Sequence, residues 1–213
     1  MIQKTGILGG TFDPVHNGHL ALASAAAELC GLSELMLLPS AAPPHKQHQE
    51  ITPFAHRTAM LDIAVRKSSL LHVSTLEDLL PKPSFTIDSL KYLELHSVGN
   101  VEFYFIIGAD AFLDILSWYK YSEVLTASHF IVFSRKGFKN KKLHRIFKYL
   151  NYIERGEHWY NEQSGKSIFT SGIVLPRISS SEIRKRIAEG RSVQGFLPEA
   201  VLKYIKKHNL YLS

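Results

Sequence analysis

The sequence has one cysteine, no long apolar run and fewer acidic than basic residues. Cys30 cannot form a disulfide within the chain, and it lies in an apolar helical pattern where a buried thiol is expected. No stretch approaches the roughly 18 apolar residues of a membrane span, and the N-terminus lacks the features of a signal peptide. We therefore expect a cytoplasmic protein in a reducing compartment.

Acidic side chains are outnumbered, because 19 Asp and Glu face 25 Lys and Arg and leave a net charge of +6. Such a balance fits nucleic acid, anionic lipid or a small polyphosphate as a partner. The one dense basic cluster, Lys136–Arg145, lacks the signature of an RNA-binding module, and we interpret it as a solvated helix face. We expect no nucleic-acid and no membrane partner, and the composition leaves a homo-oligomer open.

Short apolar strands alternate with helical patterns along the chain. Strands rich in Ile, Leu, Val and Phe without clean alternation are typical of a parallel sheet buried on both faces. We expect strands at Thr5–Leu8, Glu34–Leu38, Leu70–Ser74, Val101–Ile107 and His129–Phe133, and helices at His19–Cys30, Pro53–Lys67, Thr86–Leu95, Ser180–Glu189 and Pro198–His208. The alternation predicts an α/β fold, Rossmann-like and doubly wound, with a mostly parallel sheet.

The domain organisation is expected to be simple, because the sequence shows no linker and no internal repeat. We predict a single domain, 1–213, with a Rossmann-like core over 1–178 and C-terminal helices over 179–213. Residues 139–157 are predicted to form a helical insertion rich in polar and aromatic side chains.

The stretch GGTFDPVHNGHL follows the first predicted strand and precedes the first helix. Gly9 and Gly10 allow a sharp turn and a close approach to a ligand. A helix that begins near His16 or Asn17 directs free amides and its dipole at an anion. His16 and His19 would lie together on its first turn. The pattern is neither a Walker loop nor GxGxxG, and it predicts a cradle for a polyphosphate.

Two other interpretations of these histidines remain open at this point. They are three residues apart and could be zinc ligands, although no third and fourth ligand with standard spacing is evident. They could also be ordinary helix-capping residues. We expect no metal site made by the protein itself.

A second anion site is predicted at ISSSEIRKR. Ser179 with Glu182 three residues on is a capping-box pattern, so a helix begins here. Its first amides, the hydroxyls of Ser180 and Ser181, and the guanidinium of Arg184 can all face an anion. The alternative is a capped surface helix with solvated basic side chains.

Three further segments carry candidate residues. PPHK is a stiff loop that ends in His45 and Lys46, Asp110 follows a buried strand, and Trp118 follows the apolar segment Ala111–Leu116. Each has a plain alternative: a flexible surface lysine, a helix cap and a core aromatic, respectively.

The motifs GGTFDPVHNGH, PPHK, SFT, GAD, WYKY and ISSSEIR occur in one order across the whole chain. Together they resemble the bacterial nicotinate-nucleotide adenylyltransferases, a branch of the nucleotidyltransferases that carry an HxGH motif. The sequence departs from that pattern at Phe85, where tyrosine is usual, at Ser181, where threonine is usual, and at SRKG (134–137), where Arg-Pro-Gly is common.

The resemblance implies adenylyl transfer from ATP to nicotinate mononucleotide, assisted by Mg²⁺ held mainly by the ATP phosphates. It also implies roles for individual residues. Catalytic residues would be His16, His19, Lys46 and Arg184; ATP would bind at Gly9, Gly10, Thr11, Phe12, Gly18, Gly108, Asp110, Ser180 and Ser181; nicotinate mononucleotide would bind at His45, Ser84, Thr86, Trp118 and Tyr119.

Two alternative functions stay open from the sequence. One is another HxGH transferase, such as one that acts on nicotinamide mononucleotide or phosphopantetheine. The other is a non-catalytic nucleotide- or nucleic-acid-binding module, which the charge would allow. Two phosphate cradles suit one compact polyphosphate better than a long nucleic acid.

Overall fold

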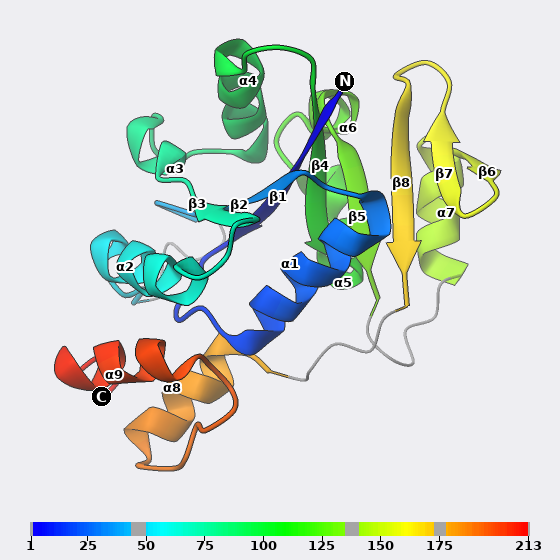
Figure 1. The fold of residues 1–213 in the computed structure, drawn as a ribbon. Helices are drawn as coiled ribbons and strands as arrows, with labels where there is room; N and C mark the ends of the chain where they lie inside the picture. The colour runs from blue at the N-terminus through cyan, green and yellow to red at the C-terminus, as the bar shows by residue number, and fades with distance from the viewer. Residues whose placement is uncertain (1, 44–49, 135–140, 173–177, 213) are drawn as a thin grey trace.

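The computed structural model describes residues 2–43, 50–134, 141–172 and 178–212. Within them, eight strands form one sheet in the order β3-β2-β1-β4-β5-β8-β7-β6 (Figure 1). The strands are β1 (Gln3–Gly10), β2 (Glu34–Pro39), β3 (Leu71–Val73), β4 (Val101–Gly108), β5 (His129–Phe133), β6 (Ile153–Arg155), β7 (His158–Asn161) and β8 (Lys166–Ser171). All pairs from β3 to β8 are parallel, whereas β7 pairs antiparallel with both β8 and β6.

The strand order reverses between β1 and β4. From β1 the chain moves outward to β2 and β3, then returns to the other side of β1 and continues through β4 and β5. In doubly wound sheets, ligands bind outside the carboxyl ends of the strands at such a reversal. The predicted α/β, mostly parallel, doubly wound fold is confirmed, and the topology places the candidate site beyond Gly10 and Gly108.

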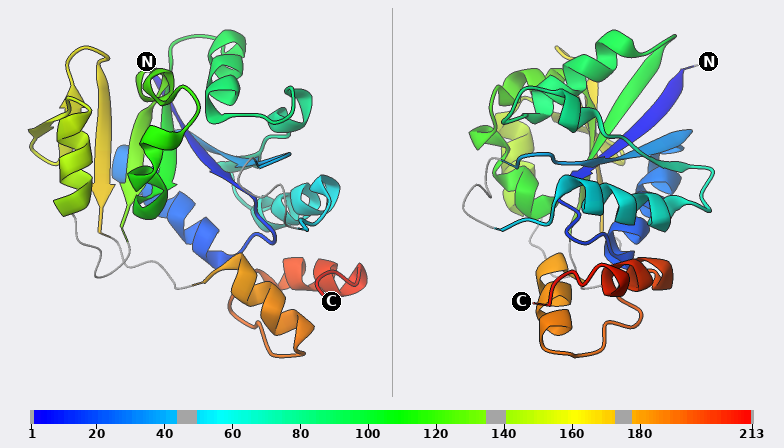
Figure 2. Two further views of the ribbon diagram at one scale, coloured as in Figure 1. Left: turned by 180° about the vertical axis from the view of Figure 1, so that it is seen from behind. Right: turned by 90° about the vertical axis from the view of Figure 1, so that its left-hand side faces the viewer.

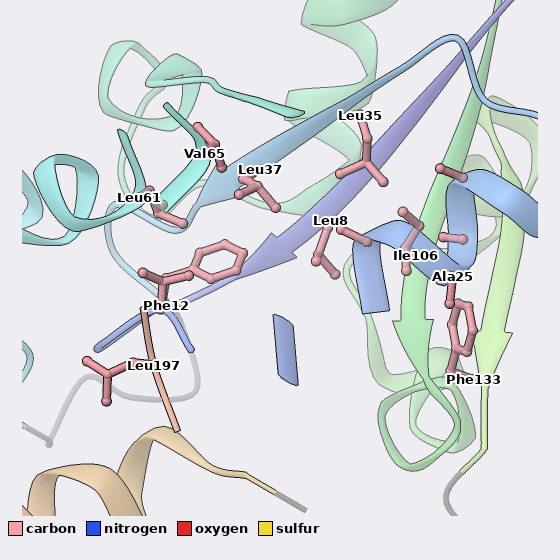
Figure 3. Close-up of a cluster of buried hydrophobic side chains, with 14 of the residues drawn as sticks. Leu8, Phe12, Ala25, Leu35, Leu37, Leu61, Val65, Ile106, Phe133 and Leu197 are labelled. Atoms are coloured by element: carbon pink, nitrogen blue, oxygen red, sulfur yellow. The ribbon is translucent and has the colours of Figure 1, made fainter. Parts of the chain in front are cut away.

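Helices cover both faces of the sheet (Figures 1 and 2). One apolar cluster joins the sheet to α1 (Asn17–Cys30), α2 (Phe54–Val65), α8 (Ser180–Ala188) and α9 (Glu199–Lys207); Figure 3 shows part of it, with Leu8, Leu37 and Ile106 from three strands. The other joins the opposite face to α3 (Leu76–Leu79), α4 (Thr86–His96), α5 (Ala109–Leu113), α6 (Tyr121–Ala127) and α7 (Lys141–Tyr149), with the 3₁₀ turn η2 (Ile115–Ser117) between α5 and α6. Burial on both faces explains why the strand sequences lack a two-residue period.

The C-terminal helices lie past the carboxyl end of β1, at the opposite end of the molecule from the N-terminus (Figures 1 and 2). The backbone amide of Asn17, the first residue of α1, donates to the carbonyl of Phe196 at 2.8 Å, and its side-chain amide donates to Gly195 at 2.8 Å. The loop between α8 and α9 is therefore bonded to the start of α1. The boundary at residue 178 between a Rossmann-like core and the C-terminal helices stays a prediction.

The prediction of a helical insertion over residues 139–157 was confirmed for α7 and wrong for the residues that follow it. Helix α7 ends at Tyr149, and the chain then forms β6, β7 and β8, which widen the sheet beyond β5. Helix α7 was foreseen because its apolar residues have helical spacing, with Leu143 and Phe147 buried. Strands β6 and β7 were missed because they have only three and four residues, and every residue of β6 is exposed. The longer β8 was also missed. Short polar strands at a sheet edge carry little hydrophobic signal.

The expectation of a buried thiol was met. Cys30 is buried and unpaired, and burial raises the pKa of its thiol to about 11. None of the helices built from the described residues is long and apolar enough to cross a membrane.

Candidate active site

A cleft of about 720 Å³ opens at the carboxyl ends of β1, β2 and β4. Its volume is in the range of sites that bind small molecules. Nine of the predicted site residues line it: Gly9, Gly10, Thr11, His19, Ser84, Thr86, Gly108, Trp118 and Tyr119. The cleft therefore brings the first motif together with SFT, GAD and WYKY, which are up to about a hundred residues away in the chain.

His16 and His19 cap the first turn of α1 reciprocally. The Nδ1 atom of His16 accepts the backbone amide of His19 at 3.3 Å, and the Nδ1 atom of His19 accepts the amide of His16 at 3.3 Å. Their rings stack with centroids 3.6 Å apart. The capping role that the sequence left open is thus real, and it fixes both rings at the helix N-terminus.

The same bonds determine the tautomer of each imidazole. Because Nδ1 accepts an amide, the ring proton of the neutral form lies on Nε2, which becomes a hydrogen-bond donor. Burial lowers the pKa of His16 to about 4, and burial together with the neighbouring His16 lowers the pKa of His19. At neutral pH the pair therefore offers two Nε2–H donors without positive charge.

These lowered pKa values predict a loss of stability in mild acid. The pKa of buried His129, whose Nδ1 accepts the Ser167 amide at 3.0 Å, is also lowered to about 4 by burial. Between pH 6.5 and 4 the unfolded chain binds protons that the folded histidines do not, so stability present above pH 6.5 is lost on acidification. From His16 and His129 we expect about 2 kcal/mol each to be lost by pH 5, measured by urea unfolding.

The replacement His129→Asn separates one of these contributions, because Oδ1 of asparagine takes the position of Nδ1 as an acceptor for the Ser167 amide but does not titrate. The variant should lose about 2 kcal/mol less than the wild type between pH 7 and pH 5. Parallel stability curves for the two proteins in that interval would contradict the assignment.

The two glycines of the first motif do not form the turn that the sequence suggested. Gly9 and Gly10 are the last residues of β1 and pair with Leu38 and Pro39 of β2. The left-handed backbone falls at Phe12, with φ of 51°. A Cβ at Gly9 would lie 3.4 Å from the Phe105 ring, and one at Gly10 would lie 3.3 Å from the Phe12 ring. The glycines make room for aromatic rings and leave backbone on the cleft wall.

Phe12 and Gly18 support the histidine pair from behind. The Phe12 side chain is 2% exposed and contacts His19 edge-on, with centroids 4.9 Å apart. A Cβ at Gly18 would come within 3.0 Å of the His16 ring. Neither residue lines the cleft, so Phe12 can offer a ligand its backbone only, and Gly18 leaves space for the imidazole.

The second motif begins a helix as predicted. Ser179 is the N-cap of α8 and accepts the amide of Glu182 at 3.2 Å. Ser180 Oγ donates to the carbonyl of Pro14 at 2.9 Å, and Arg184 Nη1 donates to the carbonyl of Asp13 at 2.7 Å. Helix α8 is thereby fixed to the loop before His16, and the N-termini of α1 and α8 are neighbours. Ser181 is exposed at the start of α8.

The wall made by SFT contains a buried carboxylate that sequence reasoning missed. Glu77 accepts from Ser84 Oγ at 2.9 Å and from the amide of Ala41 at 3.2 Å, and it lines the cleft. The Ser84 hydroxyl is therefore occupied by Glu77. Asp88 accepts the amide of Phe85 at 3.1 Å, while Thr86 begins α4 as predicted. The amides at the first positions of α4 have no partner within the helix.

The aromatic side of the cleft comes from the segment after η2. Trp118 is half-buried and lines the cleft, and its ring packs nearly perpendicular to the Phe105 ring, with centroids 6.0 Å apart. Tyr119 is 50% exposed and lies 4.6 Å from the Phe85 ring. Asp110 lies in the first turn of α5, just after Gly108, and its side chain is exposed.

Several candidates fall outside the cleft or outside the described residues. His16, Asp110, Ser180, Ser181 and Arg184 do not line the cleft itself. His45 and Lys46, together with the SRKG positions from Arg135 onward, lie outside the described residues. In the ranges that are described, no three His, Cys, Asp or Glu side chains are grouped as metal ligands.

Two buried charged residues at the site carried no sequence signal. Arg57 of α2 is 2% exposed and donates to the carbonyls of Thr11 at 2.7 Å, Ser40 at 2.8 Å and Thr52 at 2.9 Å. Asp13 is 4% exposed and lies at the centre of the loop between β1 and α1. A single arginine in an amphipathic helix gives no indication that it will bind three distant carbonyls.

The fold, the reversal of strand order and the paired histidines at a helix N-terminus define a nucleotide-binding transferase site. The sequence pattern of the cytidylyltransferase-like family matches residues 7–186, and the chain belongs to that family. Within it, the curated relatives are nicotinate-nucleotide adenylyltransferases, and the full-length matches place the chain among them.

Two of these relatives illustrate the similarity. The chain is 34% identical over 212 residues to the probable nicotinate-nucleotide adenylyltransferase of Desulfotalea psychrophila, covering 99% of this chain and 100% of that protein. It is 38% identical over 210 residues to that of Desulfitobacterium hafniense, covering 98% and 96%.

A solved structure shares the fold over nearly the whole length. The nicotinic acid mononucleotide adenylyltransferase of Plasmodium falciparum, complexed with NaAD, superposes with a TM-score of 0.73 at 25% identity, covering 98% of this chain and 97% of that one. The same enzyme complexed with APC gives a TM-score of 0.72. The expected family and fold are confirmed.

Proposed function

We propose that this chain transfers the adenylyl group of ATP to nicotinate mononucleotide, forming nicotinate adenine dinucleotide and pyrophosphate in NAD biosynthesis. The observation that carries the proposal is the shared cleft, which has His19 on one wall and Trp118 and Thr86 on another. Phosphate-binding groups and a surface suited to a pyridine ring therefore face the same space. The full-length similarity to nicotinate-nucleotide adenylyltransferases supports this substrate pair.

In the reaction, the phosphate oxygen of the mononucleotide attacks the α-phosphorus of ATP. A new phosphorus–oxygen bond forms as the bond from that phosphorus to the bridging oxygen breaks, and pyrophosphate leaves with the electron pair. The nucleophile is ionised at neutral pH, so the protein needs neither a base nor a nucleophile of its own. Catalysis then consists of positioning and of stabilising charge.

The histidine pair is proposed to stabilise the triphosphate as the pyrophosphate leaves. Because backbone amides occupy both Nδ1 atoms, the neutral Nε2–H groups of His16 and His19 are the donors proposed for phosphate at the N-terminus of α1, whose dipole favours an anion. Neutral donors held by backbone bonds need little reorganisation as charge develops. Arg184 is proposed to contribute a planar donor fork, and Lys46 a further cation.

The remaining ATP contacts are proposed for the chain around three helix N-termini. They would involve Gly9, Gly10, Thr11, Phe12 and Gly18 at the start of α1, Gly108 and Asp110 at the start of α5, and Ser180 and Ser181 at the start of α8. Gly9, Gly10, Thr11 and Gly108 line the cleft, which supports direct contact with the nucleotide.

Magnesium fits this site as a companion of the nucleotide. The described side chains form no three-ligand set, so phosphate oxygens and water would supply most of its ligands. When bound, Mg²⁺ supplies neutralisation of the charge on the leaving pyrophosphate.

The pyridine ring is proposed to stack on Trp118, with its carboxylate on the first amides of α4 and on the Tyr119 amide. His45 and Ser84 complete the proposed site, Ser84 by orienting Glu77 through its hydroxyl. A carboxylate accepts from every such amide, whereas a carboxamide must also place its own N–H donors against them. A site built to hydrogen-bond one group rejects an analogue that leaves its donors unpaired.

We expect nicotinate mononucleotide to be preferred over the amide by about 100-fold or more in kcat/KM. Competition between the two mononucleotides in one reaction with Mg-ATP measures this ratio. Trp118→Ala should weaken both substrates through lost stacking, and Trp118→Phe, which keeps a flat ring, should recover part of the loss. Equal consumption of the two acceptors would contradict the carboxylate site.

The proposed reaction itself is tested by pyrophosphate release from Mg-ATP across a panel of phosphomonoester acceptors. Nicotinate mononucleotide should be the best acceptor, with phosphopantetheine inactive. A better turnover with phosphopantetheine would move the chain to another nucleotidyltransferase class, and salt-sensitive binding to long DNA or RNA without any turnover would overturn the enzyme assignment.

A further inference from the structure

The end of the chain reaches into the loop between β1 and α1. The phenolic oxygen of Tyr211 donates to Oδ1 of Asp13 at 2.7 Å. Asp13 is 198 residues earlier in the sequence, and its side chain is almost completely buried. A residue close to the C-terminus thus binds the loop that carries His16.

Asp13 is shared between this tyrosine and two other segments. Its carbonyl accepts Arg184 Nη1 at 2.7 Å, and its Oδ2 accepts the Thr52 amide at 3.3 Å. The same Nη1 lies 4.0 Å from Oδ2. One oxygen of the carboxylate therefore binds Tyr211, while the other faces Thr52 and the edge of the Arg184 guanidinium.

Contacts with α2 and an unusual backbone conformation determine the path of the chain from α9 to Tyr211. Helix α9 packs on α2, where the Tyr204 hydroxyl lies 2.9 Å from Nδ1 of His56. After α9 ends, Asn209 and Tyr211 adopt left-handed backbone with φ of 51° and 65°. Asparagine commonly adopts such backbone just after a helix, but it is unfavourable for tyrosine, so at Tyr211 it persists only where surrounding contacts hold it. The bond from Tyr211 to Asp13 is one of these contacts.

We propose that Tyr211 is a positioning residue for Arg184 and acts through Asp13, an inference that rests on the proposed function. With Oδ1 bound to Tyr211 and Oδ2 to Thr52, Asp13 holds Arg184 by its carbonyl and a single 4.0 Å approach. A carboxylate with a vacant oxygen would attract both arms of the guanidinium fork. Loss of the tyrosine hydroxyl would let Asp13 compete with the triphosphate for Arg184.

The test compares Tyr211→Phe with Tyr204→Phe, which removes a hydroxyl from the same tail at a distance from Asp13. Both variants keep the aromatic ring. Tyr211→Phe should weaken Mg-ATP binding several-fold by calorimetry and lower kcat/KM for ATP about tenfold, with KM for the acceptor unchanged. Tyr204→Phe should match the wild type in all three.

A double-mutant cycle separates positioning from a structural role. In an Arg184→Ala background, Tyr211→Phe should have no further effect on kcat/KM for ATP, because the residue through which it acts is gone. An equal, additive loss in both backgrounds, or kinetics of Tyr211→Phe equal to the wild type, would overturn the inference.

The two proposals fail in different ways. A wild-type protein that binds Mg-ATP but transfers nothing to nicotinate mononucleotide would refute the proposed function, while the calorimetric comparison of Tyr211→Phe and Tyr204→Phe still decides the role of Tyr211. Absence of Mg-ATP binding by the wild type would refute both.

Discussion

Replacing His19 with alanine is expected to remove about 2–4 kcal/mol of transition-state stabilisation, a loss of roughly 30- to 1,000-fold in kcat/KM. The reason is geometric: the Nδ1 atom of His19 is occupied by the amide of His16, so Nε2–H is the donor left for phosphate, and the ring lines the cleft. Removing a donor held in advance resembles removing one donor from an oxyanion hole. Steady-state kinetics with Mg-ATP and nicotinate mononucleotide measure the loss.

Stability must be measured beside activity, because His19 also caps α1. Losing the cap should lower the free energy of unfolding by about 1 kcal/mol. His19→Gln is the matched control, since glutamine at this position of a capping box can accept the same amide. It should restore most of the stability but only part of the activity. A folded His19→Ala enzyme with near-normal turnover would contradict the phosphate role.

The sequence could predict the fold because each strand and helix of the core has its own local signal. The apolar runs of β1, β2, β4 and β5 were found at nearly their observed positions, and their alternation with helices implied the parallel sheet. The N-cap at Ser179 was predicted from capping chemistry, which depends on three or four consecutive residues, and the start of α4 at Thr86 was predicted from the helical pattern of its sequence.

The errors occurred where packing, rather than local sequence, decides the conformation. A Gly-Gly pair usually indicates a turn, yet here Gly9 and Gly10 continue β1 by pairing with β2, at positions where a Cβ would contact the rings of Phe105 and Phe12. The turn falls instead on Phe12, whose buried ring secures an unfavourable backbone. Neither ring's position can be deduced from the motif alone.

The polar network under the site was invisible to sequence reasoning for a related reason. Asp13 binds Tyr211 across nearly the whole chain, and Glu77 joins the loop after β2 to the start of α4. Such bonds form between residues that only the finished topology makes neighbours. Arg57 is the clearest case, because its position in an amphipathic helix suggested nothing beyond a helical residue.

Replacing Arg57 with methionine is expected to lower the free energy of unfolding by about 3–5 kcal/mol. The guanidinium bonds the carbonyls of Thr11, Ser40 and Thr52, which belong to three segments around the cleft. Methionine fills much of the volume but leaves these acceptors without a donor in a buried site. Burial lowers the pKa of Arg57, which reflects the cost of holding this charge away from water.

Two further variants make this measurement specific. Arg57→Lys keeps the charge but has no planar fork to span three carbonyls, so it should recover only part of the lost stability. Arg66→Met removes an arginine from the exposed C-cap of the same helix. It should lower the free energy of unfolding by less than about 1 kcal/mol. Urea unfolding at pH 7 compares all three with the wild type.

Arg57→Met should also impair catalysis, because Arg57 donates hydrogen bonds to Thr11 and Ser40, and both of these residues line the cleft. Without these bonds, the loop before His16 and the loop after β2 can move independently, and misplacement of about 1 Å can cost roughly 100-fold in rate. We therefore expect kcat/KM to fall even at temperatures where Arg57→Met remains folded. An Arg57→Met protein that loses less than about 1 kcal/mol of stability and keeps wild-type kinetics would show that the three carbonyls find other donors, and that the arginine does not organise the site.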